Sequence, residues 1–221
     1  MSNVYALPFR QPIDYPLVTP SANLAVSLTN VKAWLKIPST LTADDTLITY
    51  LIKAATGYFE KITGRDLVNK TYKTYLDSFP SVNGIYYYSG ASPLLSQYQD
   101  NGIILKKSPL SSITSIKYYQ DGSLVTWDSA DYYTTVSTDY SAIYLTDEVS
   151  FPTDIDIRRQ AIVINFVAGY GVDDTYVPDD MQQAVMRFIE YLYDNRGDCS
   201  DLAKQNAAIG LFMPFKITEN M

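Results

Sequence analysis

The chain has 221 residues, of which 47% are apolar and 19% charged, a composition typical of a folded protein and too apolar for a disordered one. Its formal net charge is −7, and Lys and Arg are not concentrated anywhere, which argues against a protein that wraps nucleic acid. Histidine is absent and Cys199 is the single cysteine, so Ser-His-Asp and Cys-His nucleophiles, histidine-based zinc sites and an internal disulfide are excluded. No apolar run approaches the roughly 18 residues of a membrane span. We therefore expect no enzymatic activity, no cofactor, no metal site and no membrane partner.

Residues 1–26 are predicted to form an extended arm. Proline recurs at every fourth position from Pro8 to Pro20, and proline at this density blocks helix and removes backbone hydrogen-bond donors. Apolar side chains between the prolines give the arm contacts to bury, and they include Tyr5, Leu7, Phe9, Ile13 and Tyr15. We expect the arm to lie along its own domain or along a neighbouring chain.

Two helices are predicted next, and they begin a helical core that comprises residues 27–69 and 172–210. Ser27 is a suitable N-cap for a short helix that ends before Pro38. The longer helix starts with a pattern that resembles a capping box, at Thr42-Ala43-Asp44-Asp45, and ends at Gly64. Its apolar residues recur at helical spacing, at Ile48, Leu51, Ile52, Ala55, Phe59 and Ile62.

Residues 70–171 change in character and are predicted to form a small antiparallel sheet inserted between the helices. Short runs rich in Ile, Val, Thr and Tyr indicate strands at 70–76, 102–107, 113–119, 132–136, 142–146 and 161–168. Turn signals such as Asp121-Gly122 separate several of these runs. The stretch 81–99 is predicted to be a long loop or an elaborated hairpin, and its Tyr86, Tyr87 and Tyr88 are candidates for outer contacts.

Helix is predicted to return after Val177, because Pro178 and the acids of Asp179-Asp180 favour a helix start. A short further helix is expected at 201–208. The terminal segment 211–221 is apolar for a chain end and is predicted to be a docking tail, with Leu211, Phe212, Met213, Pro214, Phe215 and Lys216 as its contact residues. The expected fold is therefore α+β, with three to four helices, an antiparallel β insertion and extended arms at both ends.

Three carboxylate pairs suggest chemistry at first sight: Asp44-Asp45, Asp173-Asp174 and Asp179-Asp180. Two of them stand at predicted helix starts, where acids stabilise the helix dipole, and adjacent acids point in different directions instead of facing one substrate. Asp173-Asp174 lacks the regular alternation of oxygen ligands that loop calcium sites use. The 20 tyrosines fit half-buried strands and interfaces, so they indicate structure and contact.

The order of these elements resembles the head–tail connector (adaptor) proteins of tailed bacteriophages. The resemblance begins at Val26–Lys36, and its most specific part runs from Asp44-Asp45 through Ala54-Ala55 to Thr63-Gly64-Arg65. It continues through Ser108-Pro109-Leu110, Ile116-Lys117-Tyr118-Tyr119 with Asp121-Gly122, Val167-Ala168-Gly169-Tyr170-Gly171, Val177-Pro178 and Leu192-Tyr193-Asp194-Asn195-Arg196. The proline-rich arm and the tyrosine-rich loop depart from the family pattern.

The resemblance implies a structural protein of the virion neck, made in the host cytoplasm, that forms a homo-oligomeric ring, expected to be a dodecamer, below the portal protein. Double-stranded DNA would pass through the lumen without sequence-specific binding, and the ring would link the head to stopper and tail proteins. We expect Leu211 to Lys216 to dock on the portal, so that deleting 211–221 abolishes portal capture and leaves the fold intact. The N-terminal arm would brace a neighbour or a tail protein. The alternatives are a stopper or tail-completion protein of the same neck, and a tyrosine-rich host-recognition or carbohydrate-binding module.

Overall fold

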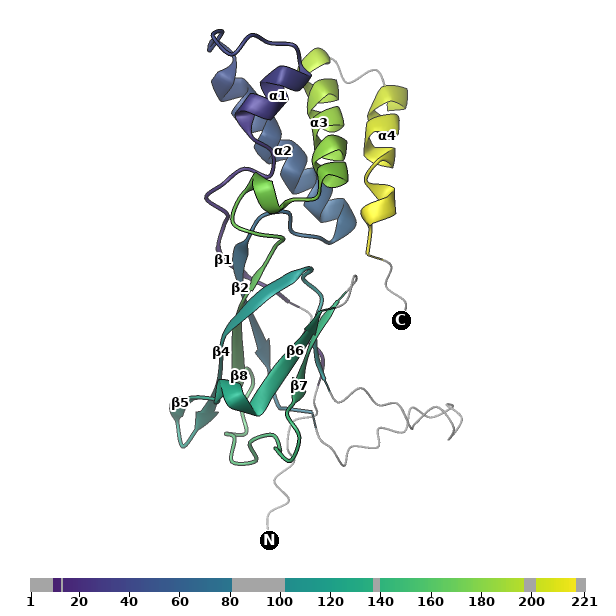
Figure 1. Cartoon of the computed structure of the whole chain (residues 1–221). Coiled ribbons are helices and arrows are strands. Elements are labelled where there is room, and N and C mark those ends of the chain that lie inside the picture. The colour runs from purple at the N-terminus through teal and green to yellow at the C-terminus, as the bar shows by residue number, and fades with distance from the viewer. Residues whose placement is uncertain (1–9, 13, 81–101, 137–139, 197–201, 218–221) are drawn as a thin grey trace, which may run out of the picture.

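Two parts, one helical and one built of strands, stack end to end along an elongated molecule (Figure 1). The computed structural model describes residues 10–12, 14–80, 102–136, 140–196 and 202–217. Along the chain, a short strand comes first, then two helices, then the remaining strands, and finally two further helices. This arrangement confirms the predicted α+β class with an antiparallel β insertion between helices.

The helical part consists of α1 (Leu28–Trp34), α2 (Asp45–Thr63), α3 (Asp179–Asp194) and α4 (Leu202–Gly210). The apolar stripes of α2 and α3 face each other, and α1 and α4 cover them from either side (Figure 1). The buried cluster includes Val31, Ile48, Ile52, Phe59, Val185, Phe188 and Ile189. Ala25 and Val26 belong to the same cluster, so the end of the expected arm is part of the helical core.

The helix ends follow local rules with one exception. The Ser27 hydroxyl accepts a hydrogen bond of 3.2 Å from the Asn30 backbone N–H at the start of α1, and Gly64 ends α2 with a φ of 77°. The capping box predicted at the start of α2 is wrong, because the N-cap Asp44 makes no side-chain capping bond. Its carboxylate instead accepts a hydrogen bond of 2.5 Å from the Tyr193 hydroxyl on α3, so a tertiary contact replaces the local cap.

The β part contains two antiparallel sheets. The five-stranded sheet has the order β1 (Leu17–Thr19), β2 (Lys70–Leu76), β8 (Ile162–Ala168), β4 (Leu110–Gln120) and β5 (Ser123–Thr126). The three-stranded sheet has the order β3 (Ile103–Leu105), β7 (Ser141–Leu145) and β6 (Tyr132–Val136). The prediction of one sheet was wrong, because a run of β-forming residues does not show which strand it pairs with.

A second core lies between the two sheets. Alternate residues of β8 are fully buried and face this core, as expected for a strand covered on one side. The cluster draws on both sheets and includes Ile103, Leu105, Ile116, Ile143, Ile162, Ile164 and Phe166. Near the end of the β part away from the helices, Phe79, Trp127 and Phe151 pack their rings at centroid distances of 5.0–5.7 Å.

Candidate interaction surfaces

The acidic pairs serve the fold. Asp45 forms an ion pair of 2.8 Å with Lys32, and Asp173 accepts a hydrogen bond of 3.0 Å from the Thr175 backbone N–H. The Asp180 carboxylate accepts a hydrogen bond of 2.9 Å from the backbone N–H of the next residue, within the first turn of α3. Within the described ranges, no group of three or more acidic or cysteine side chains could hold a metal ion. None of the described helices is long and apolar enough to cross a membrane.

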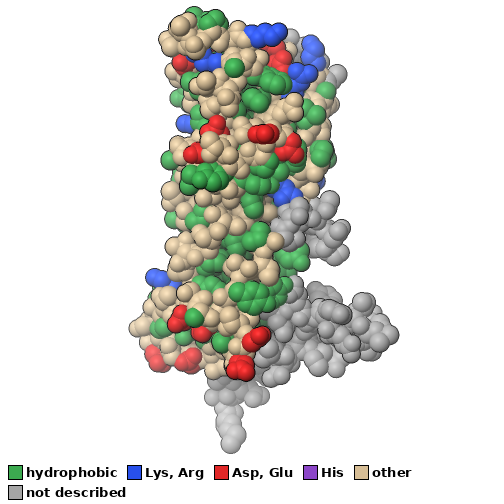
Figure 2. Space-filling model, viewed as in Figure 1, with side chains coloured by type: hydrophobic (Ala, Val, Ile, Leu, Met, Phe, Trp, Pro, Cys, Tyr) green, Lys and Arg blue, Asp and Glu red, His purple; other side chains and the backbone are tan. Residues whose placement is uncertain are grey.

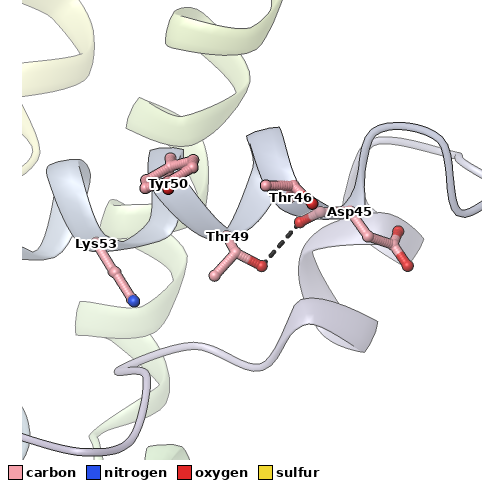
Figure 3. Close-up of a pocket in the computed structure, with 5 residues that line it drawn as sticks. All are labelled: Asp45, Thr46, Thr49, Tyr50 and Lys53. Carbon is pink, nitrogen blue, oxygen red and sulfur yellow. Dashed lines mark hydrogen bonds between the residues drawn. The ribbon is translucent and has the colours of Figure 1, made fainter.

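A shallow, open pocket lies on the outer side of α2 (Figure 3), lined by Asp45, Thr46, Thr49, Tyr50 and Lys53. The Thr49 hydroxyl donates a hydrogen bond of 2.8 Å to the Asp45 carbonyl oxygen, as threonine does within a helix. The charged side chains Asp45 and Lys53 stand at opposite ends of the pocket, and Asp45 is already paired with Lys32. This arrangement suits a contact surface better than a catalytic site.

The joint between the two parts is held by a buried cluster of charged groups. Lys70, the first residue of β2, donates a hydrogen bond to the Glu60 carboxylate on α2 and lies 3.1 Å from an Asp66 carboxylate oxygen. The Tyr72 hydroxyl donates a hydrogen bond of 2.7 Å to the same Asp66 oxygen. Lys107 lies 3.9 Å from the other Asp66 oxygen and 4.8 Å above the Tyr72 ring. The cluster therefore ties α2 to the first strand of the insertion.

Burial sets the protonation of this cluster. It raises the pKa of Glu60 in spite of the neighbouring Lys70 ammonium. Burial lowers the pKa of Lys70, but the Glu60 and Asp66 carboxylates outweigh it, and the net direction is upward. Burial and the Asp66 charge raise the pKa of the Tyr72 hydroxyl, which remains a donor at neutral pH. Lys70 thus stays a cation between two carboxylates.

A second connection between the parts passes close to the first one. The Asn69 backbone N–H donates a hydrogen bond of 2.8 Å to the Gly171 carbonyl oxygen, so the two crossing segments are joined. Gly169 has a φ of 137°, and a Cβ there would lie 2.5 Å from the Asn69 backbone nitrogen. Only glycine permits this close approach, which explains the first glycine of the Val-Ala-Gly-Tyr-Gly pattern at the end of β8. A Cβ at the second, Gly171, would overlap the Tyr176 side chain.

The C-terminal segment packs on its own chain. Phe212 is fully buried in the helical core, with its ring 4.9 Å from Phe59 and 5.5 Å from Phe188. Leu211 is 45% exposed and Met213 is 54% exposed, so these two face outward. The apolar content that marked this segment as a docking tail thus belongs in part to the core. Deleting 211–221 would remove a core ring, and an intact fold is not expected.

The described part of the N-terminal segment also packs on its own chain. Residues Leu17–Thr19 form β1 on the edge of the larger sheet, a strand that the sequence did not predict. The Tyr15 ring packs edge-on against Phe166 at 6.1 Å, and its hydroxyl accepts a hydrogen bond of 3.1 Å from the Lys106 backbone N–H. Tyr15 therefore serves its own β part. The other predicted contact residues, Tyr5, Leu7, Phe9, Ile13 and Tyr86 to Tyr88, lie outside the described residues.

Charge is unevenly spread along the molecule. Figure 2 shows acidic side chains both at the β end and over the helical part, whereas most basic side chains lie near the outer end of the helical part. The turns at the β end carry Asp121, Asp128, Asp131, Asp147, Glu148, Asp154 and Asp156. Arg158 in the same region stacks 3.8 Å above the Tyr119 ring. Acidic side chains therefore outnumber basic ones in these turns.

The sequence model described as "Phage gp6-like head-tail connector protein" matches residues 25–135, about half of the chain. The chain belongs to this family. The matched residues contain α1, α2 and the buried charged cluster, so the Thr63-Gly64-Arg65 motif marks the joint between the two parts. No curated protein matches the chain significantly.

Solved structures with the same fold come from gene transfer agent (GTA) particles. A chain from the "neck of empty GTA particle computed with C6 symmetry" has a TM-score of 0.71 and 17% identity, over 95% of this chain and 98% of that chain. A chain from the virion of a native particle has a TM-score of 0.70 and 17% identity over the same shares. A third, from the "neck of native GTA particle computed with C12 symmetry", has a TM-score of 0.65 and 15% identity, again over 95% and 98%. The fold shared with these chains thus extends over nearly the whole chain.

Proposed function

We propose that the protein is a structural, non-enzymatic head–tail adaptor, one subunit of a ring that lies below the portal in the virion neck. The ring extends the DNA channel and links the head to stopper and tail proteins, after synthesis of the subunits in the host cytoplasm. Membership of the connector family carries this proposal. Support for a twelvefold ring comes from the C12 and C6 symmetries named for neck structures that share the fold, since a ring of twelve satisfies both.

A ring subunit must hold a fixed shape while neighbours pack against it on both sides. The charged cluster of Glu60, Asp66 and Lys70 supplies this rigidity, because a buried ion pair holds its partners in one geometry. The hydrogen bond from the Asn69 N–H to the Gly171 carbonyl oxygen belongs to the second connection between the two parts. It restrains rotation of the β part about the first connection, from α2 to β2. The acidic body suits a channel wall past which DNA slides without sticking.

Portal docking is assigned to the outward side chains of the C-terminal segment. Phe212 is buried in the core and Phe215 is half-buried, so the exposed side chains that remain for a partner are Leu211, Met213, Pro214 and Lys216. The double variant Leu211→Asp/Met213→Asp is expected to lose capture by portal rings and to keep its thermal stability. The control is Leu124→Asp on β5, an equally exposed leucine on the β part. Equal capture of both variants would remove the docking assignment.

The ring itself is tested with the purified full-length protein and the portal of the same phage. Negative-stain images should show closed rings stacked on portal rings. Isolated protein should not bind duplex DNA tightly in a salt-dependent manner. Binding to a glycan array without any ring would favour the carbohydrate-binding alternative. Rings that join the tail side without touching the portal would favour a stopper.

A further inference from the structure

The smaller sheet has an open edge at β6. The strand order β3-β7-β6 places β6 at one side, and no described strand pairs with its far edge. β6 has five residues, Tyr-Tyr-Thr-Thr-Val, and contains no charge, proline or glycine. Such an edge presents a row of backbone N–H and C=O groups that can pair with an added strand.

Two other sheet edges are protected in the ways that proteins commonly use. β1 has three residues and stands between Pro16 and Pro20. β5 has four residues and stands between Asp121 and Asp128. Short length, proline and charge all discourage pairing at an edge. β6 is longer than β1 or β5 and contains no proline or charge within it, although Asp131 precedes it.

Side chains on both faces of β6 are left partly uncovered. Tyr132 turns inward and packs on Trp127, with 5.0 Å between the ring centroids, but Val136 on the same face is 57% exposed. On the other face, Tyr133 stacks on Tyr144 of β7 at 5.7 Å and is still 50% exposed. The side chains of a further strand beside β6 would pack against Val136 on one face and Tyr133 on the other, since cross-strand neighbours lie about 5 Å apart.

The N-terminal segment reaches the opposite edge of the same sheet. The Gln11 side-chain amide donates a hydrogen bond of 2.9 Å to the Gly102 carbonyl oxygen and accepts one of 2.8 Å from the Ile104 backbone N–H. This double contact fixes residue 11 at β3. Residues 1–9 precede it and carry no charged side chain, and Tyr5, Leu7 and Phe9 alternate, so an extended chain would place them on one face.

We propose that residues 4–9 of one subunit add as a strand to the β6 edge of the neighbouring subunit in the ring, an inference that rests on the proposed function. Residues 4–9 span roughly 20 Å when extended, which exceeds the roughly 17 Å of a five-residue strand, and residue 10 alone separates them from Gln11 beside β3. A side-by-side ring joins opposite sides of successive subunits, and β3 and β6 are opposite sides of one sheet. The subunit's own β6 is out of reach, because two Cα steps from residue 9 to Gln11 span about 7 Å, whereas the far edge of β6 lies roughly four strand spacings, about 19 Å, from a chain beside β3. Pro8 has no N–H to donate, so its backbone nitrogen must face away from β6 in the added strand. The uncharged edge thereby receives an uncharged strand.

The test uses the full-length chain with Cys199→Ser, so that only introduced cysteines react. One preparation carries Leu7→Cys and another carries Thr134→Cys on β6, and the two are mixed before assembly with portal rings. A short bis-maleimide, which tolerates a shift in register, is expected to give a covalent dimer. The matched control replaces Thr134→Cys by Thr126→Cys, an exposed threonine on β5, and should give no dimer. Adding Thr135→Lys to the Thr134→Cys subunit is expected to abolish the dimer, because a charge blocks strand addition.

The possible outcomes distinguish failure of the strand addition from failure of the proposed ring function. Normal rings without the 7–134 product, or with as much product from Thr126→Cys, overturn the strand addition and leave the ring intact. A product that forms only when both cysteines are in one subunit shows that the arm covers its own β6, and also overturns it. Failure of the unsubstituted protein to form rings overturns the proposed function and the inference with it.

Discussion

The Arg65 side chain at the end of α2 donates a hydrogen bond of 2.7 Å from Nε to the carbonyl oxygen of Phe215, 150 residues further along the chain. Two residues later, the Ile217 backbone N–H donates a hydrogen bond of 2.8 Å to the Thr63 carbonyl oxygen. The C-terminal segment is therefore fastened to the end of α2, next to the joint between the two parts. Portal docking by Leu211 and Met213 would thus act on a segment that is already rigid.

Removing the buried ring of the C-terminal segment should destabilise the helical part. Phe212→Ala leaves a cavity between Phe59 and Phe188, and such a change typically costs about 3–5 kcal/mol. Urea denaturation followed by circular dichroism measures the loss. Met213→Ala, one residue away and exposed, should stay within about 0.5 kcal/mol of the parent. Equal effects of the two variants would contradict the buried position of Phe212.

Removing the Lys70 ammonium from the joint should lower the free energy of unfolding by more than the loss of a surface ion pair would. Lys70→Met leaves the Glu60 and Asp66 carboxylates buried without their shared partner, a loss of about 3–5 kcal/mol. The matched control is Lys73→Met on the same strand, for which the described residues provide no ion pair, and it should be nearly neutral. The free energy of unfolding from urea titration decides between them. A neutral Lys70→Met would show that the cluster does not hold the joint.

Two glycine-to-alanine substitutions should change the stability of the fold in opposite directions, because only Gly169 lies at the close approach at the end of β8. Gly169→Ala places a Cβ against the Asn69 backbone at a φ of 137° and should destabilise by about 2–4 kcal/mol. Gly57→Ala lies within α2, where a Cβ meets nothing within 4 Å, and should stabilise by about 0.5–1 kcal/mol. Thermal melting of both variants provides the comparison, and a tolerated Gly169→Ala would be the contrary result.

Alkaline pH should weaken the fold through buried phenols. Burial, partly opposed by the Lys106 backbone N–H, raises the pKa of Tyr15 from 10.0 to about 12. Because the folded-state pKa lies above the unfolded one, this stability is complete below pH 10 and is lost as the pH rises through about 12. The raised pKa values of Lys70 and Tyr72 act in the same direction. The urea midpoint should fall less between pH 10 and 12 for Tyr15→Phe than for the parent; identical slopes would contradict the assignment.

Local patterns predicted the elements whose signals are strong. β2 and β6 have the predicted bounds, 70–76 and 132–136, because each is a continuous run of β-forming residues. Gly64 ended α2 as expected, since only glycine readily takes the left-handed conformation there. β1 and β5 were missed because three or four residues are too few to show a period of two.

Long-range relationships could not be predicted from one sequence. The pairing of Glu60 with Lys70 joins two elements whose relative placement no local pattern reveals, although Thr63-Gly64-Arg65 marked the region. Phe212 satisfied the pattern of an exposed docking tail and of a core residue equally well, because apolar content alone does not distinguish them. The division of the strands into two sheets could not be predicted either, because a run of β-forming residues does not show which other strand it pairs with.

The most direct test of the central claim is the mass of the complex that the purified protein forms with portal rings, measured by native mass spectrometry. A closed ring predicts a single integral stoichiometry, and the twelvefold symmetry of a neck with this fold predicts twelve copies of the 24.8 kDa chain. A monomer or a broad distribution of open oligomers in the presence of portal would contradict the ring.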